Sequence, residues 1–415
     1  MSLDTSWSSD KDLLKAHRSR QRRERVSSMK VRRFLGAAAL AIVAGAAQAA
    51  SYPEPLANEP IPNVVELSAQ YPASWIYVQD LHFNSLPDGR AAIVDVAADA
   101  RAFKGQVPVA QFGTLLPSTT RPDIYVAETF FSRMTRGERT DVITIWDKAT
   151  LKTKGEIVLP GGKRGQFVTL RNSFQLTNGE KWALLFNFTP ASSVSVIDID
   201  ARKILNEIDL PGCSLVYPTG PRGFTSLCAD GTMTSIELDD AGKVAASSTS
   251  KPINDIDHDP MFMTPAMVGK TAWFVTFKGN IHGLDLANAK ARDLGVFPMP
   301  KEKTAEGEWR PGGWQVISAD AAGRLYVLMN PAGKEGSHKD GGSEVWVVDP
   351  ARKQRVARIP LQNPAVSVEV TAQSAPLLVA SRSDGSLDVY DAASGAFQRT
   401  LAQVVHDPMT MTASR

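Results

Sequence analysis

The sequence predicts an all-β fold, a seven-bladed β-propeller of four-stranded antiparallel blades. Seven times along the chain an alternating apolar run ends on an aspartate, and a turn and a second β-like run follow. These aspartates are Asp95, Asp147, Asp198, Asp239, Asp285, Asp349 and Asp391. The gaps between them are 52, 51, 41, 46, 64 and 42 residues. Repeats of about 40–50 residues built from short strands are typical of propeller blades.

Each repeat has the local pattern of a blade. Alternation directs one set of side chains toward the neighbouring blade, and the terminal aspartate can accept backbone N–H groups in the turn. The run that follows is expected to stop at a proline in three repeats, at Pro160, Pro211 and Pro360, because proline lacks the donor that a continued ladder needs. A further strand precedes the aspartate run, as at 123–126 and 182–186. One blade cannot bury its faces alone, so we expect residues 71–415 to form a single propeller domain.

The first 50 residues have the layout of a leader. Lys30, Arg32 and Arg33 precede an apolar stretch at 34–47 and small residues at 47–50, which is typical of a secretory signal peptide. The stretch is too short and too rich in alanine for a membrane span. We interpret 1–28 as an over-extended start before Met29 and 29–50 as the signal peptide, with general and twin-arginine export both open.

Removal of the leader reverses the sign of the net charge. Residues 1–50 hold 10 of the 46 Lys and Arg and 4 of the 44 Asp and Glu, which leaves 36 and 40 and a net charge of −4. The basic character of the full chain therefore does not support nucleic-acid binding. Residues 51–70 carry four prolines between 53 and 62 and are expected to form an extended arm, either reaching a partner subunit or loosely ordered.

The two cysteines, Cys213 and Cys228, are expected to form a structural disulfide, because an even pair in an exported protein is normally oxidised. The segments beside them, 215–218 and 224–227, have the pattern of adjacent strands of one blade. A bond that closes a loop of this length contributes about 3 kcal/mol in the chain-entropy model. Redox catalysis is disfavoured because there is no Cys-x-x-Cys spacing.

The sequence contains no recognisable catalytic motif. Six histidines, at 17, 82, 258, 282, 338 and 406, form no metal-ligand cluster, and there is no Gly-x-Ser-x-Gly elbow. The glycine-rich segment 161–165 follows a strand and a proline and is interpreted as a hairpin loop rather than a phosphate cradle. We therefore expect no catalytic residue and no metal site on this chain.

Three segments depart from the blade pattern. Arg133, Arg136 and Arg139 recur at intervals of three in an expected loop before a strand, where a solvated connection with Glu138 and Asp141 as partners is the plain alternative to a subunit interface. Trp309 and Trp314 flank a Pro-Gly-Gly turn. Residues 333–339 form a charged insertion within the widest gap between aspartates.

The arginine segment running into 142–147, the tryptophan turn and the Cys213 to Cys228 spacing together resemble the large (heavy) subunit of quinoprotein amine dehydrogenases. This family includes methylamine dehydrogenase and aromatic amine dehydrogenase. The resemblance covers essentially the whole chain after the leader. It implies a seven-bladed propeller in a periplasmic α2β2 complex, with the arginine and tryptophan segments as candidate interface or structural loops.

The resemblance also implies a division of labour. The small (light) subunit carries tryptophan tryptophylquinone, which oxidises a small primary amine to an aldehyde and passes electrons to an amicyanin- or azurin-like cupredoxin. The present chain carries no cofactor; it holds the quinone subunit and walls the substrate channel. The residue that matches the family's channel phenylalanine is Phe83, for which a hydrophobic plug in the first blade is the alternative.

Two questions stay open at this point. Residues 333–339 and 353–360 look more like the aromatic amine enzyme, whereas the tryptophan turn looks closer to the methylamine enzyme, so the substrate is either class. The alternatives in function are an exported stand-alone propeller that binds a ligand or protein, and a lactonase-like propeller hydrolase.

Overall fold

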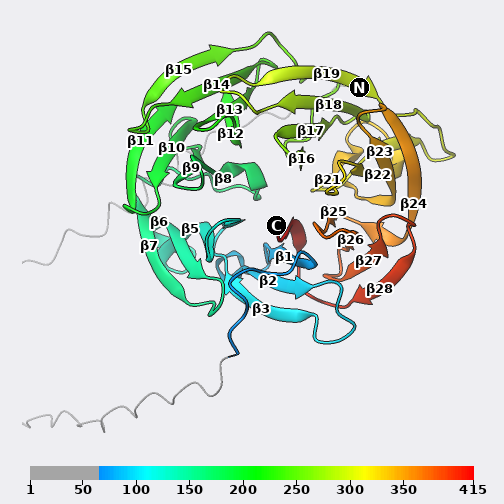
Figure 1. The fold of residues 1–415 in the computed structure, drawn as a ribbon, viewed down its shortest axis with the longest axis horizontal. Helices are drawn as coiled ribbons and strands as arrows, with labels where there is room; N and C mark the ends of the chain where they lie inside the picture. The colour runs from blue at the N-terminus through cyan, green and yellow to red at the C-terminus, as the bar shows by residue number, and fades with distance from the viewer. Residues whose placement is uncertain (1–64) are drawn as a thin grey trace, which may run out of the picture. The chain divides into compact units, whose positions relative to one another are not determined.

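Seven antiparallel sheets follow one another around a central axis in the computed structural model, which describes residues 65–415 (Figure 1). The first blade contains β29 (Pro408–Ala413), β1 (Trp75–Asp80), β2 (Arg90–Asp95) and β3 (Phe103–Pro108). The second contains β4 (Thr114–Pro117), β5 (Asp123–Arg133), β6 (Arg136–Asp147) and β7 (Thr153–Leu159). The third contains β8 (Phe174–Thr177), β9 (Trp182–Asn187), β10 (Ser193–Asp198) and β11 (Lys203–Asp209).

The remaining blades repeat this order. The fourth contains β12 (Cys213–Pro218), β13 (Gly223–Cys228), β14 (Met233–Leu238) and β15 (Val244–Thr249). The fifth contains β16 (Ala266–Val268), β17 (Thr271–Val275), β18 (Asn280–Asp285) and β19 (Arg292–Pro298). In the sixth, β20 (Glu308–Pro311) and β21 (Ile317–Ala319) both pair with β22 (Leu325–Gly333), followed by β23 (Gly342–Asp349) and β24 (Gln354–Ala365). The seventh contains β25 (Ser367–Val370), β26 (Leu377–Ser381), β27 (Leu387–Asp391) and β28 (Phe397–Leu401).

The aspartate repeat marks the end of the third strand of every blade, as predicted. Each of the seven carboxylates accepts a backbone N–H from the following turn at 2.7–3.2 Å; the donors are Ala97, Ala149, Ala201, Ala241, Ala287, Ala351 and Ser394. A bond of this kind, from Thr150 to Asp147 and from Ala287 to Asp285, lowers the pKa of the accepting carboxyl. The seven-bladed, all-β prediction is therefore confirmed.

The ring is closed by a strand from the other end of the sequence. The C-terminal strand β29 pairs with β1 and forms the inner strand of the first blade. The buried carboxylate of Asp80, at the end of β1, accepts the backbone N–H groups of His82, His406 and Asp407 at 2.9 Å. One side chain thus joins segments more than 320 residues apart and fixes the loop that follows β1.

The hydrophobic core is distributed between blades rather than gathered at one centre. Six clusters of buried apolar side chains each join neighbouring sheets, as where Trp346 and Val327 of the sixth blade pack with Val275 of the fifth. Because each blade buries its apolar side chains against the adjacent blades, a blade is stable only when its neighbours are present.

Three local predictions are corrected. The inner strand of the sixth blade is divided into β20 and β21, so this sheet has five strands. Strand β24 does not stop at Pro360 but continues to Ala365, because β24 is the outermost strand and needs no N–H donor on its free side. Residues 161–165 are part of the connection from the second blade to the third, not a hairpin loop.

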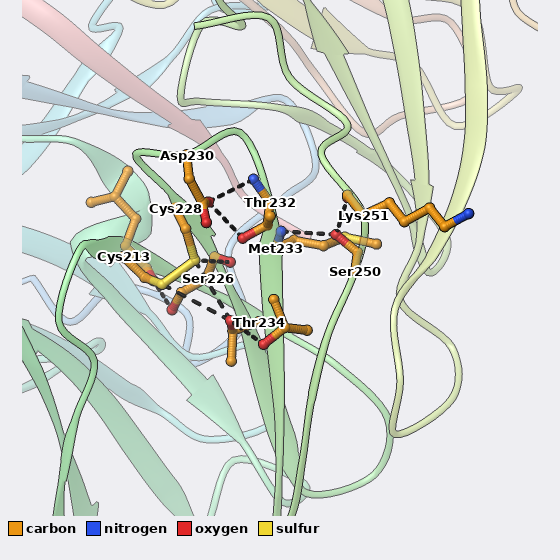
Figure 2. Close-up of a disulfide and its surroundings, with 11 residues drawn as sticks. Cys213, Ser226, Cys228, Asp230, Thr232, Met233, Thr234, Ser250 and Lys251 are labelled. Atoms are coloured by element: carbon orange, nitrogen blue, oxygen red, sulfur yellow. Dashed lines mark hydrogen bonds between the residues drawn. A yellow bond between two sulfur atoms is a disulfide. The ribbon is translucent and has the colours of Figure 1, made fainter.

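The predicted disulfide is present in the fourth blade (Figure 2). Cys213 begins β12 and Cys228 ends β13, and the two residues are direct partners in the sheet register. The turn after Cys228 is shaped by Asp230, whose carboxylate accepts the N–H and hydroxyl of Thr232, and Gly231 has a φ of 80°. The disulfide therefore links the innermost strand of this blade, β12, to its second strand, β13.

The leader (1–50) and most of the predicted arm (51–70) lie outside the described residues. Of the arm, residues 65–70 form no strand, and the Leu67 N–H donates to Ala149 O at 2.8 Å. Between residues 65 and 415 there is no helix long and apolar enough to cross a membrane.

Candidate docking face

The unusual segments of the sequence lie at one end of the blades. In an antiparallel blade, the link between the second and third strands and the link to the next blade lie at the same end. We call this end the hairpin face; it carries Phe83, the β5–β6 hairpin, the start of β20 and the insertion after β22. The links between first and second strands, and between third and fourth, form the opposite face.

Phe83 lies in the loop after β1 and is 45% exposed, so it does not fill the core as a plug would. Its N–H donates to the Asp407 carboxylate at 3.0 Å, and the preceding His82 has a φ of 43°. The rings of His82 and His406 stack with centroids 4.8 Å apart. The ring-closure contacts thus hold the backbone of Phe83 in place while its side chain projects from the hairpin face.

The arginine segment is a projecting β-hairpin, not a loop before a strand. Register pairs continue from Phe130 with Thr140 to Arg133 with Arg136, beyond the last partners of β4 and β7. Residues 130–140 are therefore a two-stranded extension of the second blade, with residues 133–136 at its tip. The prediction of a loop was wrong, because the two strands continue to pair through this segment, which the spacing of the arginines alone did not indicate.

The three arginines of the hairpin differ in their surroundings. Arg139 donates from Nε and Nη2 to both oxygens of Asp141 at 2.9 Å and to Arg164 O at 2.6 Å. Within residues 65–415, Arg133 and Arg136 have no carboxylate within 4.0 Å. Both are exposed beside Met134, which is 74% exposed, and Phe130, which is 44% exposed. The hairpin tip is thus cationic and apolar together.

The base of the hairpin contains a buried polar cluster that the sequence analysis missed. The Arg164 guanidinium donates to Thr129 Oγ1 at 3.0 Å, Phe112 O at 2.8 Å and Gln111 O at 2.5 Å. Burial lowers the pKa of Arg164 to about 10. Burial also raises the pKa of Glu128 to about 7, although Thr144 Oγ1 and Ala110 N–H donate to its carboxylate. No local motif signals this cluster, because its members come from four separate segments.

The tryptophan turn is tied into the ring. Trp309 packs on Trp346 with centroids 5.9 Å apart, and the Arg358 guanidinium lies 5.1 Å from its ring. Trp314 Nε1 donates to Thr169 O at 3.1 Å, a contact between segments 145 residues apart. Arg139 and Trp314, both singled out from the sequence, therefore both contact the connection 160–173 between the second and third blades.

The insertion 333–339 builds a small cavity. It contains the short 3-10 helix η3 (Ser337–Lys339), and the His338 ring stacks on Phe277 with centroids 4.3 Å apart. Burial and the nearby Lys339 lower the pKa of His338. The cavity has a volume of about 140 Å³, and charged side chains of both signs line it. Over the described part of the chain, no three His, Cys, Asp or Glu side chains come together to hold a metal ion.

Fold and face together define a seven-bladed propeller protein that presents a projecting hairpin and a half-exposed phenylalanine on one face. Residues 88–414 match the family model described as methylamine dehydrogenase heavy chain, and the chain belongs to this family. Membership confirms the resemblance identified from the sequence and gives the chain the general role of an amine dehydrogenase subunit.

Curated relatives agree with this assignment. The methylamine dehydrogenase heavy chain of Paracoccus versutus is 30% identical over 295 residues, which cover 69% of this chain and 67% of that protein. The heavy chain of Methylorubrum extorquens is 27% identical over 401 residues, 92% of this chain and 95% of that protein. Both matches span the greater part of the two proteins compared.

Solved structures support the fold alone. A candidate 6-phosphogluconolactonase from Bacteroides fragilis superimposes with a TM-score of 0.56 at 12% identity, covering 85% of this chain and 99% of that one. A dihydro-heme d1 dehydrogenase gives a TM-score of 0.50 at 16% identity, covering 85% and 78%. At these identities the likeness carries no argument about activity.

Proposed function

We propose that this chain is the large, cofactor-free subunit of a periplasmic amine dehydrogenase that converts primary amines to aldehyde and ammonia. The partner would be a small subunit bearing tryptophan tryptophylquinone, in an α2β2 complex, and a cupredoxin would accept the electrons. The family match over residues 88–414 carries the proposal. In this complex the chain positions the small subunit and walls the path of the amine.

The chemistry of the hairpin tip supports its use as part of the subunit interface. Arginine, methionine and aromatic side chains are enriched in protein interfaces, and the tip presents all three at once. Exposed apolar groups such as Met134 and Phe130 are costly to leave in water when they are contiguous. Arg133 and Arg136 can supply charge-assisted hydrogen bonds to carboxylates or carbonyls of the partner.

The position of Phe83 supports its use as a channel wall. Its backbone is held by Asp407 and, through His82, by Asp80, so the ring projects from a fixed loop. A rigid aromatic side chain can define the width of a path for small amines without losing much conformational entropy on complex formation. The amine class, methylamine or aromatic, then depends on side chains contributed by both subunits.

The decisive experiment is to co-express the chain with any small, cysteine-rich protein that is encoded beside it, isolate the complex and record its visible spectrum. We expect co-purification and a quinone band that is bleached by methylamine or by tyramine, and the amine that bleaches it faster names the substrate class. Trimethylamine is the matched control, because it has no N–H bonds to lose in forming an imine.

A stable, colourless chain that purifies without a partner and leaves both amines unchanged would contradict the proposal. That result would favour an exported propeller that binds a ligand or another protein. Hydrolysis of a lactone by the isolated chain would instead favour the lactonase-like alternative.

A further inference from the structure

A second site lies on the opposite face, where the second blade meets the first. Here a cavity of about 510 Å³ is lined by residues from four segments: the stretch 69–71, the β4–β5 link, the β6–β7 link and the end of the chain. This volume falls within the range of about 300–1,000 Å³ that is usual for small-molecule sites. Lys148, Arg121 and Arg415 line it, and no aspartate or glutamate does.

Lys148 is the unusual member of this cavity. The residue is only 7% exposed, and its Nζ donates to Ser118 O at 2.6 Å. Within residues 65–415 no carboxylate lies within 4.0 Å of this ammonium group. An ammonium has three donors, so one backbone carbonyl leaves most of its hydrogen-bonding capacity unused. Burial accordingly lowers the pKa of Lys148.

The acidic groups nearest to Lys148 already have partners. Glu180 accepts five hydrogen bonds from the side chains and backbone of residues 118–120, and these bonds outweigh its burial and lower its pKa to about 2. Asp123 accepts the Lys154 ammonium at 2.6 Å. Both carboxylates attract the Lys148 ammonium from a distance and partly oppose the lowering of its pKa by burial, but neither lies within 4.0 Å of it. A buried cation without a close ion-pair partner is disfavoured.

The cavity also has the walls that an organic anion needs. The Tyr71 hydroxyl donates to Lys148 O at 2.6 Å, which fixes the tyrosine beside the lysine as a semi-polar wall. Arg121 is anchored by Asp200 through two bonds of 2.6 and 2.9 Å, so it contributes a positioned guanidinium at low net charge. Arg415 is exposed at the rim and has no carboxylate partner within the described part of the chain.

We propose that this cavity binds a small organic oxyanion, a carboxylate or a phosphate monoester, with the Lys148 ammonium as its principal partner and Arg415 at the rim. Charge-assisted hydrogen bonds from an ammonium to an oxyanion are the strong kind and would satisfy the donors left over by Ser118. The site lies on the face away from Phe83 and the hairpin, so it is independent of the proposed amine oxidation. Amine turnover and anion binding can therefore fail separately.

The test uses thermal unfolding and calorimetric titration of the full chain in sodium phosphate, sodium succinate and sodium chloride at equal ionic strength. Phosphate or succinate should raise the Tm by about 2 °C over chloride, because a ligand that binds only the folded state stabilises it. Lys148→Met should abolish that rise and weaken the apparent Kd at least about tenfold. In chloride it should unfold no earlier than the wild type, because a buried charge without a close ion-pair partner has been removed.

Two further variants make the result interpretable. Arg415→Ala, at an exposed position on the rim, should weaken binding several-fold without changing the Tm in chloride. Lys243→Met, in an exposed turn of the fourth blade, should behave as the wild type. A response to phosphate alone, to succinate alone or to both anions supports the site and names its ligand class. Equal shifts in all variants, or no shift above chloride in the wild type, would overturn it.

Discussion

The arginine hairpin and the tryptophan turn both depart from the blade pattern in the sequence, yet the fold uses them differently. The hairpin leaves its blade beyond Ala127 and presents exposed Arg133, Met134 and Arg136. The turn does the reverse, since Trp314 reaches 145 residues back along the chain to Thr169 O and Trp309 packs on Trp346. An unusual motif therefore indicates a special role for its residues. Their burial shows whether that role is to stabilise the fold or to contact a partner.

The hairpin itself contains both kinds of residue, those with internal contacts and those that are exposed. Arg139, at its base, is held by Asp141 and Arg164 O, whereas Arg133 and Arg136 at the tip have no such partners among the described residues. Substitutions at the base of the hairpin should therefore lower the stability of the fold strongly, and substitutions at its tip should have a negligible effect on stability. The predictions below follow that order, measured as the free energy of unfolding.

The largest effect is expected at the hairpin base. Arg164→Met should lower the free energy of unfolding by about 3 kcal/mol, because Gln111 O, Phe112 O and Thr129 Oγ1 each lose a buried donor. Urea denaturation measures it, with Arg136→Met at the exposed tip as the matched control, for which no loss above about 0.5 kcal/mol is expected. Equal losses for the two variants would erase the distinction between base and tip.

The next effect depends on pH and comes from Glu128. Its pKa is raised to about 7 by burial, so between pH 4.5 and 7 the folded state keeps a proton that the unfolded state has released. The wild type should therefore lose stability as pH rises through this window, by up to about 3 kcal/mol. Glu128→Gln should flatten the slope, measured as the free energy of unfolding at pH 5 and pH 7.5. A slope that rises with pH and survives in Glu128→Gln would rule out this group as its source.

The aspartate repeat and the buried cations show which features could be predicted from the sequence alone and which could not. The aspartate repeat predicted the third strand of every blade because its signal is local: the alternation and the turn bonds lie within a few residues of each aspartate. The contacts of Arg164 and Lys148 could not be predicted in this way. They join segments 30–53 residues apart, and an arginine beside glycines or a lysine after an aspartate has no distinctive local pattern.

A smaller effect is expected in the tryptophan turn. Trp314→Phe keeps an aromatic ring but removes the N–H that donates to Thr169 O, so the free energy of unfolding should fall by about 1 kcal/mol. Trp309→Phe is the companion variant, because Trp309 contributes stacking on Trp346 rather than this long-range bond. Hydrogen exchange of residues 160–173 separates them: only Trp314→Phe should loosen that connection. Protection unchanged in both variants would show that the bond across the ring is dispensable.

The smallest effect on the free energy of unfolding is expected at Met134, where a substitution should instead affect association with the partner subunit. Met134 is 74% exposed at the hairpin tip, so Met134→Asp should leave the free energy of unfolding within about 0.5 kcal/mol of the wild type. If the tip contacts the small subunit, a buried carboxylate there should weaken association by about tenfold, or about 1.4 kcal/mol. Val244→Asp is the matched control, since Val244 is 44% exposed on the outer strand of the fourth blade, and sedimentation or titration of the purified subunits measures both. Association weakened equally by the two variants would assign the effect to charge in general, and association unchanged in both would remove the tip from the interface.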